Sequence, residues 1–260
     1  KLTAEITQLL NSTGKVTGRP AEIRQEIIDA VGATEAEIPF VAEIVEVLAD
    51  EKPLWNDAIE KVLHSLGLCL LVPDTYYSAV NAYLNAHRDL KGKVVFHHVT
   101  GKPPRPIFPD PRALVTKLAF NPKSQYAGWV ENHIAGRFNY LCTQSQVEFE
   151  RAERALLPSG LNRNKDRHER DDSPAHRHLL GWDNRELLRE KQRSARELNE
   201  SIGKLEKGLS SIEKELSTIG NKENVLSIFL EMKQFPKIDW QSDVLKISAL
   251  LKQKAELENS

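Results

Sequence analysis

The sequence predicts an α/β fold of two pseudo-repeated lobes, flanked by the helices of an antiparallel coiled-coil arm. The first observation behind this prediction is a pair of matching segments, 55–72 and 126–142, which align with an offset of 71 positions. In that alignment Ile59 meets Val130 and Glu60 meets Glu131. The second observation is a heptad pattern of apolar residues after the repeat. A duplicated α/β unit beside a coiled coil is typical of a dimerisation device rather than a catalytic pocket.

Composition excludes several classes of protein. The 260 residues are enough for one or two domains, and the net charge of −1 gives no global signal for nucleic acid or membrane binding. No apolar run approaches the roughly 20 residues that cross a bilayer. The chain begins with Lys1 rather than Met, so we expect a piece of a longer protein. Cys69 and Cys142 lie in apolar stretches and are predicted to be buried thiols of a cytosolic protein, neither disulfide-bonded nor metal-bound.

The N-terminal region, residues 1–35, is predicted to hold arm helices. Residues 1–10 and 21–31 have helical periodicity, and Gly32 ends the second helix. The mostly apolar stretch 38–48 fits either a strand or a short helix, and its pattern leaves both open.

The first lobe is predicted over about 36–100. Apolar residues recur at helical spacing in 54–66, Gly67 stops the helix, and the apolar run 68–72 has the length of a strand covered on both faces. A second helix follows over 76–85. Residues 93–99, entered through Gly92, form the next strand candidate.

The second lobe is predicted over about 112–160, after a linker at 100–111 with five prolines, which fit neither helix nor sheet. The expected order is a strand at 114–120, a helix, Gly136, a strand at 138–142 and a helix at 145–156. The alternation of strands and helices indicates an α/β domain.

The remaining residues divide into a charged loop at 161–180 and an arm at 181–260. Residues 162–178 are polar and without periodicity, which predicts a flexible loop. The arm carries apolar residues spaced 4-3-4-3-4-3, namely Leu198, Ile202, Leu205, Leu209, Ile212, Leu216 and Ile219. This pattern favours a coiled coil or a long helical hairpin over an amphipathic helix packed on a core. A break at Phe235-Pro236 separates a further helix that begins near Trp240.

These residues resemble the hinge of SMC-type proteins, the ABC-ATPases of chromosome condensation. The likeness rests on the helix that begins at Trp55, on Leu70-Leu-Val-Pro73, and on the glycine-led strands at Gly92 and Gly136. It extends over about 36–190. Further details, such as Arg167-His-Glu-Arg-Asp-Asp172 and Leu180-Gly-Trp-Asp-Asn184, resemble the SMC-like subunit of Wadjet anti-plasmid systems and the related MksB and MukB-type condensins.

The resemblance implies a homodimer in which each half of one hinge meets the opposite half of its partner. The implied interface residues are Gly92, Lys93, Val94, Val95, Phe96, Gly136, Arg137, Phe138 and Tyr140. It also implies a bacterial, cytoplasmic, nucleoid- or plasmid-associated protein that extrudes DNA loops through ATPase heads outside this chain. Kleisin, accessory and nuclease subunits would contact regions mostly outside it, and no membrane partner is implied.

No enzymatic site or cofactor is predicted for the chain itself. Gly14-Lys15 and Gly101-Lys102 lack the remaining P-loop residues, so no ATP site is expected. A competing hypothesis is a DNA- or metal-dependent enzyme that uses the His/Asp loop at 166–178, although a flexible loop lacks the frame that metal ligands need.

DNA contact is the other alternative. Residues 36–160 hold 13 Lys and Arg against 14 Asp and Glu, and residues 161–178 hold 5 against 4, so neither is a strongly basic stripe. The residues proposed for weak DNA contact are Arg163, Lys165, Arg167, Arg170 and Arg177.

Overall fold

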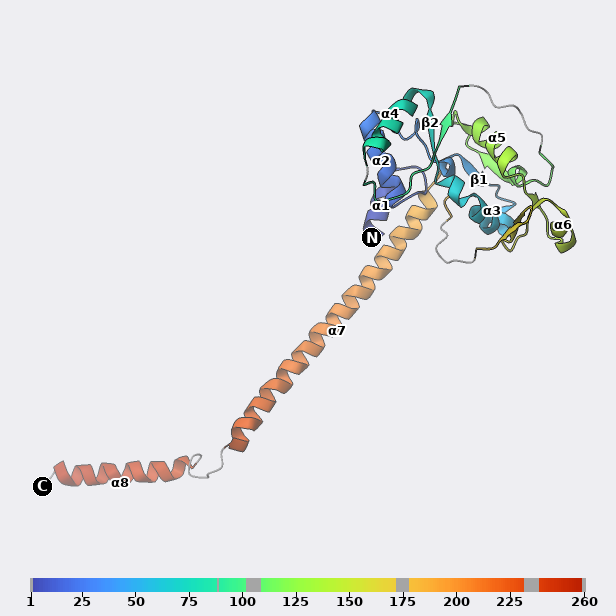
Figure 1. Cartoon of the computed structure of the whole chain (residues 1–260). Helices are drawn as coiled ribbons and strands as arrows, with labels where there is room; N and C mark the ends of the chain where they lie inside the picture. The colour runs from blue at the N-terminus through green and yellow to red at the C-terminus, as the bar shows by residue number, and fades with distance from the viewer. Residues whose placement is uncertain (1, 88, 102–108, 172–177, 232–238, 259–260) are drawn as a thin grey trace. The chain divides into compact units, whose positions relative to one another are not determined.

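The computed structural model of the chain describes residues 2–87, 89–101, 109–171, 178–231 and 239–258. The chain divides into two compact units, residues 1–195 and residues 196–260 (Figure 1). The first unit contains the predicted α/β fold. The second contains the C-terminal part of one long helix and a further helix.

The first unit opens with two helices and continues with the first lobe. The helices are α1 (Leu2–Asn11) and α2 (Arg19–Val31). The first lobe contains the 3-10 helix η1 (Val41–Glu43), β1 (Val45–Val47), α3 (Lys52–Gly67), β2 (Leu70–Pro73), α4 (Asp74–Ala86) and β3 (Phe96–Val99). The stretch 38–48, whose pattern fitted helix or strand, thus contains both a 3-10 turn and a short strand.

The second lobe repeats this order of elements and then adds a hairpin. It contains η2 (Leu114–Lys117), β4 (Leu118–Phe120), α5 (Ala127–Arg137), β5 (Leu141–Cys142), α6 (Gln146–Arg151), β6 (Arg154–Leu156), β7 (Asn162–Asn164) and β8 (Arg167–Glu169). In both lobes the strand after the long helix pairs in parallel with the next strand, as β2 with β3 and β5 with β6. The prediction of two pseudo-repeated lobes is confirmed.

Backbone hydrogen bonds reproduce the repeat. In the first lobe, Val41 N–H donates to Cys69 O over 2.9 Å, and Leu71 N–H donates to Pro39 O over 2.9 Å. In the second lobe the same two bonds run from Leu114 N–H to Tyr140 O and from Cys142 N–H to Arg112 O, each 2.9 Å long. In each lobe, therefore, the segment that leads into the 3-10 helix lies along one side of the strand that follows the long helix, which is β2 in the first lobe and β5 in the second.

A reciprocal ladder joins the lobes. Strands β1 and β4 pair antiparallel, with Glu46 opposite Ala119 at the middle of the register. Beyond the strands, Leu48 N–H donates to Lys117 O over 3.0 Å, and Asn121 N–H donates to Ile44 O over 2.8 Å. Because these two bonds exchange donor and acceptor positions between the repeats, the lobes are related by an internal pseudo-two-fold axis.

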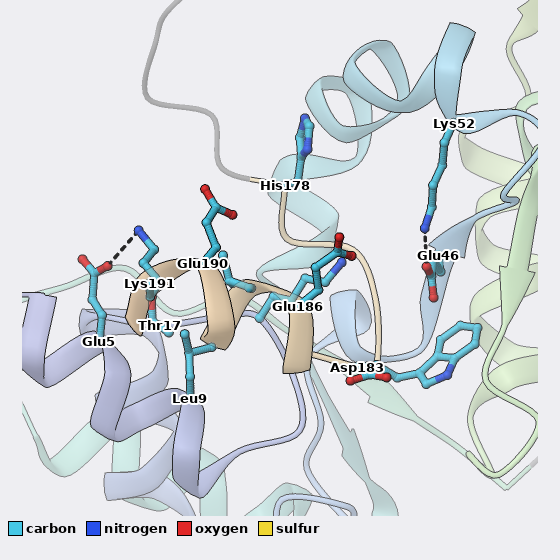
Figure 2. Close-up of a pocket in the computed structure, with 13 residues that line it drawn as sticks. Glu5, Leu9, Thr17, Glu46, Lys52, His178, Asp183, Glu186, Glu190 and Lys191 are labelled. Atoms are coloured by element: carbon cyan, nitrogen blue, oxygen red, sulfur yellow. Dashed lines mark hydrogen bonds and ion pairs between the residues drawn. The ribbon is translucent and has the colours of Figure 1, made fainter. Parts of the chain in front are cut away.

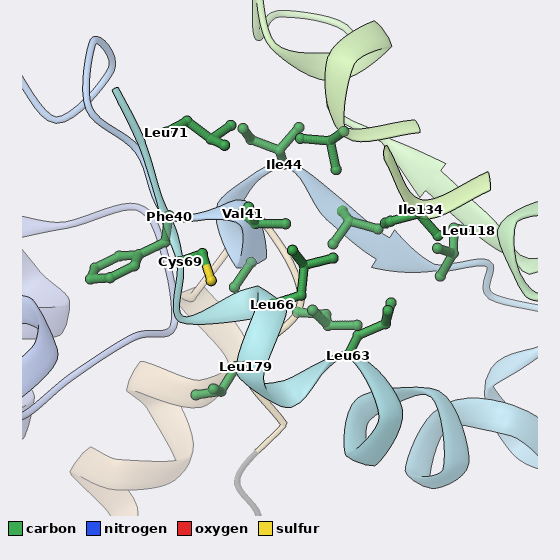
Figure 3. Packing of buried hydrophobic residues seen from close by; sticks show 14 of the residues in the cluster. Phe40, Val41, Ile44, Leu63, Leu66, Cys69, Leu71, Leu118, Ile134 and Leu179 are labelled. Atoms are coloured by element: carbon green, nitrogen blue, oxygen red, sulfur yellow. The ribbon is translucent and has the colours of Figure 1, made fainter. Parts of the chain in front are cut away.

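A single apolar cluster fills both lobes. Leu63 of α3, Leu118 of β4 and Ile134 of α5 belong to it, and all three are almost completely buried (Figure 3). Cys69 and Cys142 are buried free thiols, as predicted. Burial raises the pKa of Cys142 to about 12, so this thiol is protonated and unreactive at neutral pH.

Three sequence predictions for residues 136–169 are wrong. Gly136 lies inside α5 rather than before a strand, and β5 covers only Leu141–Cys142. The helix expected at 145–156 ends at Arg151 and gives way to β6. The segment predicted as a flexible loop contains the hairpin of β7 and β8, which extends the sheet to the order β5-β6-β7-β8. The polar hairpin lacks the apolar alternation of a half-buried strand, because β8 is exposed throughout.

The second unit contains α7 from residue 196 onward and α8. Helix α7 (Arg185–Glu231) has 47 residues and α8 (Trp240–Glu258) has 19, and neither has a buried residue among those described. The heptad side chains of α7 are more than two-fifths exposed, from Leu198 to Ile219. The predicted break at Phe235-Pro236 falls outside the described residues. Among the described helices, none is both long and apolar enough to span a bilayer.

Candidate functional site: the interlobe groove and the arm junction

The first set of predicted interface residues lies at the entrance to β3. Gly92, Lys93, Val94 and Val95 precede the strand, and Phe96 is its first residue. Strand β3 pairs with β2 on one side, and Leu70 N–H donates to Val95 O over 2.9 Å. In the two-stranded sheet that the described residues form, the opposite side of β3 has no strand partner.

The second set lies at the end of α5. Gly136 and Arg137 belong to the last turn of the helix, Phe138 follows it, and Tyr140 is buried. This set was expected to form a strand edge, and that geometry is not observed. Strand β5 lies between β6 and the segment Arg112–Leu114, so both of its sides are occupied.

A groove brings the two sets together. Its volume is about 560 Å³, and its lining includes Gly92, Lys93, Val95, Arg137 and Phe138. The remaining wall is formed by the start of α2 and the end of α3, including Ile23 and Leu66. Five of the nine predicted interface residues therefore line one surface between the lobes, even though only the first set adjoins an open strand edge.

Two histidines that also line this groove form an aromatic cluster with a neighbouring tryptophan. The rings of His97 and His133 lie 4.7 Å apart, and Trp129 stacks on His133 at 4.7 Å. Burial, the neighbouring His97 and the charge of Arg137 lower the pKa of His133 to about 4. Burial and Arg137 also lower the pKa of His97. Both imidazoles are therefore neutral near pH 7.

The residues proposed for DNA contact lie on the β7–β8 hairpin and are largely engaged. Arg163 donates to the backbone carbonyls of Glu150 and Lys165. Lys165 and Arg167 form ion pairs with Glu153 at 3.6 Å and Glu169 at 2.8 Å. Arg170 follows the hairpin and also interacts with another group, while Arg177 lies outside the described residues. The hairpin thus presents partly neutralised cations.

The alternative metal site receives no support from the described part of the chain. No group of three or more His, Cys, Asp or Glu side chains there is arranged to hold a metal ion. Asp172 and His176 of the predicted loop lie outside the described residues. His178 instead bonds Asp57 at 2.7 Å on the surface of α3.

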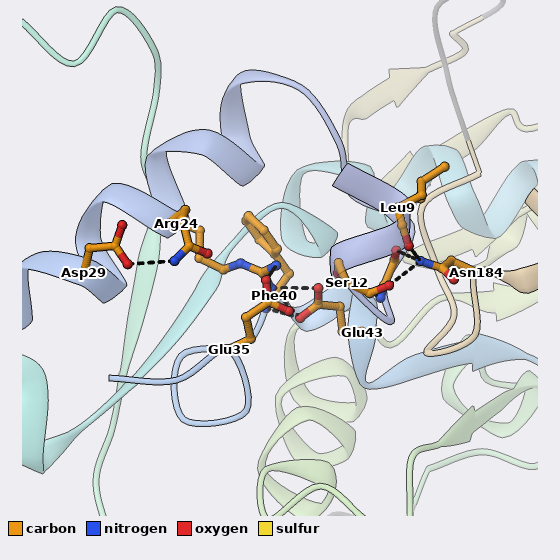
Figure 4. Close-up of polar contacts among 10 residues, drawn as sticks. Leu9, Ser12, Arg24, Asp29, Glu35, Phe40, Glu43 and Asn184 are labelled. Carbon is orange, nitrogen blue, oxygen red and sulfur yellow. Dashed lines mark hydrogen bonds and ion pairs between the residues drawn. The ribbon is translucent and has the colours of Figure 1, made fainter. Parts of the chain in front are cut away.

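A junction of buried polar groups joins the end of α1 to the start of α7. The side-chain amide nitrogen of Asn184 lies within hydrogen-bonding distance of three backbone carbonyls, which share its two N–H donors: those of Leu9 at 2.8 Å, Ser12 at 2.5 Å and Gly14 at 3.1 Å (Figure 4). The carboxylate of Glu60 on α3 accepts from Leu179 N–H at 3.0 Å and from Leu180 N–H at 3.1 Å. Burial raises the pKa of Glu60, and the two N–H groups act against that shift.

Beside the junction lies a cavity of about 580 Å³ with charged walls (Figure 2). Glu5 of α1 pairs with Lys191 of α7 at 3.4 Å, and Lys52 pairs with Glu46 at 2.6 Å. Lys15 donates to Leu180 O over 2.7 Å. These charges bind neighbouring elements to one another, so the cavity is better explained as part of the junction than as a reaction site.

A buried ion pair joins α2 to the start of the first lobe. The guanidinium of Arg24 lies between Glu43 and Glu35 and over the ring of Phe40 (Figure 4). Arg24 Nη1 contacts both Glu43 oxygens, at 2.7 and 2.8 Å. Glu43 also accepts from Phe40 N–H, so this pair connects α2 to the first turn of the lobe.

Sequence reasoning missed the junction residues. Glu60 was noted only as a repeat position, and Asn184 only as part of a motif. A signal was available in the apolar pattern of this helix, because apolar residues flank Glu60 in the sequence, and in the structure Glu60 is only 3% exposed. A carboxylate on the buried face of a helix requires hydrogen-bond donors, which here come from the segment before α7.

No protein-family model and no curated protein matches the chain. Among solved structures, a chain described as the folded elbow of cohesin has 13% identity, covering 98% of this chain and 37% of its own length, with a TM-score of 0.48. The Pyrococcus furiosus Smc hinge domain with an extended coiled coil has 21% identity, covering 97% and 90% of the two chains, with a TM-score of 0.42. The asymmetric dimer of the Geobacillus stearothermophilus SMC hinge domain has 16% identity, covering 76% and 88%, with a TM-score of 0.40.

Proposed function

We propose that this chain is the hinge of an SMC-like protein and joins two copies of it into a homodimer. The observation that carries the proposal is the pair of lobes related by an internal pseudo-two-fold axis, followed in the chain by the long heptad helix α7. The work of such a module is mechanical. A chain of this kind holds two arms together and has no need of a reactive centre.

The open side of β3 supports a role in association. An unpaired strand edge offers N–H and C=O groups to another chain, and a two-fold dimer lets two identical surfaces satisfy each other. Val95, at the entrance to β3, is one of few large apolar side chains exposed in the first unit, at 39%. It lines the groove that also contains Lys93 and Phe138.

The test is sedimentation of the chain over a range of concentrations. We expect a reversible dimer, and Val95→Asp should weaken it at least about tenfold, since a buried charge without a partner is strongly unfavourable at an interface. Val147→Asp is the matched control, because Val147 is another exposed valine of the first unit, on α6 and outside the groove, at 55%. A strict monomer, or equal effects of the two substitutions, would contradict the proposal.

Within the SMC-like proteins, we propose JetC of the Wadjet plasmid-defence system as the branch, with an MksB or MukB-type condensin as the second candidate. The supporting feature is the segment 180–184, whose Asn184 forms the junction described above. The full protein would then be a cytoplasmic, DNA-loop-extruding ATPase with kleisin, accessory and nuclease partners. Recovery of a Walker A motif and an ABC signature in the flanking gene sequence tests this assignment.

We propose that the chain itself has no enzymatic activity and needs no cofactor. The competing function is a DNA- or metal-dependent enzyme built on residues 166–178. Incubation of the purified chain with plasmid and Mg²⁺ or Mn²⁺ separates the two. Cleavage that is lost on His168→Ala would favour the enzyme, whereas intact plasmid favours the hinge.

A further inference from the structure

The interlobe groove has the size of a small-molecule site. Its volume of about 560 Å³ falls in the range of about 300 to 1,000 Å³ that is usual for ligand pockets. Its floor is apolar, with Leu66 and Leu68 from the end of α3 and Phe138 after α5. No carboxylate is among the described residues that line it.

The groove contains positive charge that the described residues neutralise only in part. Four cationic side chains line it. Arg19 is committed to Glu22 and Glu26 by ion pairs at 3.3 and 2.8 Å, and Lys91 lies 3.9 Å from Asp89. The two others, Lys93 and Arg137, form no ion pair with any described residue. They lie on opposite lobes, one before β3 and one at the end of α5.

The histidine pair does not make up a metal site. His97 and His133 lie close together, but no group of three or more His, Cys, Asp or Glu side chains among the described residues is arranged to hold a metal ion. The adjoining thiol of Cys69 is buried, and burial raises its pKa. The groove thus has no activated nucleophile, and binding is the chemistry it can perform.

The backbone at the rim is also constrained. Lys91 has a φ of 46°, a left-handed conformation that is uncommon for a residue other than glycine, and such strain often occurs at functional sites. Arg19 holds this turn by donating to the carbonyl of Leu90. A side chain at Gly92 would force Ile23 to shift, because a Cβ there would lie 2.6 Å from Ile23 Cδ1. The loop therefore lies tightly over α2 at the edge of the groove.

We propose that the interlobe groove binds a small amphiphilic anion, with a phosphate or carboxylate between Lys93 and Arg137 and an apolar body over Leu66 and Phe138. Such a ligand contacts both lobes of one chain, so the proposal does not depend on dimerisation. A bound ligand would occupy the surface that Val95 also lines, and would thereby compete with any partner there.

Isothermal titration of the full chain with two probes tests the proposal. The probes are 1-naphthyl phosphate, with a rigid aromatic body, and dodecanoate, with a flexible acyl chain. We expect one site per chain for at least one probe, and the better probe identifies the type of apolar body. Lys93→Glu and Arg137→Glu should each lower the affinity about tenfold or more, as expected for the loss of a charge-assisted contact. Phe138→Ala should also lower the affinity, although the charges of Lys93 and Arg137 are retained.

Lys123→Glu is the matched control, because Lys123 is an exposed lysine outside the groove. It should bind like the parent chain, which shows that net charge alone does not set the affinity. Circular dichroism melts of every variant establish that each one folds. Absence of one-to-one binding for both probes, or equal affinity in the Lys93, Arg137 and Lys123 variants, would overturn the proposal. Sedimentation of the same variants measures dimerisation separately, so a failure to bind the probes can be distinguished from a failure to dimerise.

Discussion

The side-chain amide of Asn184 lies 2.8 Å from the carbonyl oxygen of Leu9 and thereby ties the start of α7 to the end of α1. The last carbonyls of a helix have no partner within it, and the Asn184 amide contacts that of Leu9 in the last turn of α1 as well as the carbonyls of Ser12 and Gly14 beyond the helix. The connection is local to the first unit. It fixes where the long helix leaves the two lobes.

Asn184→Ala is expected to destabilise the first unit by about 2 to 4 kcal/mol, because buried carbonyls lose their donor. Urea unfolding followed by tryptophan fluorescence measures the change. Asn81→Ala is the control, since Asn81 is exposed and donates only within α4. A difference below about 0.5 kcal/mol between the two variants would show that the junction is not a stabilising contact.

Glu43→Ala should cost about 3 to 5 kcal/mol, because Arg24 is only 2% exposed and would keep a buried charge with a weaker set of partners. Glu22→Ala removes an exposed partner of Arg19 and should cost less than about 1 kcal/mol. Thermal melts of the two variants compare them directly. Similar melting temperatures would contradict the assignment of Arg24–Glu43 as a structural ion pair.

Acid should weaken the fold through His133. Its pKa is about 4 in the folded chain and about 6.5 in the unfolded chain, so the unfolded state binds more protons between these values. Stability from this residue is complete above about pH 6.5 and falls as the pH drops toward 4. The loss is about 1 to 2 kcal/mol after allowing for solvent screening of a half-buried ring.

Replacing His133 with Phe should flatten the dependence of unfolding free energy on pH across that window. The phenyl ring can still stack on Trp129, so packing is largely retained. His87→Phe serves as the control, because His87 lies against Tyr83 on an exposed face of α4. An unchanged slope in the His133 variant would exclude this residue as a source of acid sensitivity.

The apolar stripe of α7 should associate with another helix. Leu209→Asp places a charge in the stripe and should abolish any concentration dependence of the helical melt, because apolar a and d positions drive coiled-coil pairing. Ser210→Asp, next to it but outside the heptad positions, should not. Circular dichroism at several concentrations makes the comparison. A melt that is independent of concentration in the parent chain would count against pairing between chains.

Much of the fold could be predicted because apolar periodicity determines it. The helix of Lys52–Gly67 and the strand of Leu70–Pro73 follow directly from helical spacing, a glycine stop and an apolar run. Gly136 misled the prediction, since a glycine can be accommodated inside a helix as well as before a strand. The exposed strand β8 has no apolar face, so no local signal distinguishes it from a loop.

The candidate sites were harder to predict because they depend on distant contacts. Lys93 and Arg137 were predicted as parts of two strand edges, but the groove that joins them requires the packing of α5 beside β3. Asn184 and its partner Leu9 are separated by 175 positions, and polar residues give no periodic signal at such a range. Whether the predicted residues form a dimer interface stays a prediction.

The ladder between β1 and β4 has a consequence for how the chain can be divided. Each lobe supplies only one of its two strands, so neither lobe can complete the ladder by itself. A chain cut between β3 and η2 should give fragments that fail to fold separately and reconstitute when mixed, as a split protein does. The bonds from Leu48 and Asn121 would re-form across the cut, so the two halves would recognise each other by the same contacts that now hold one molecule together.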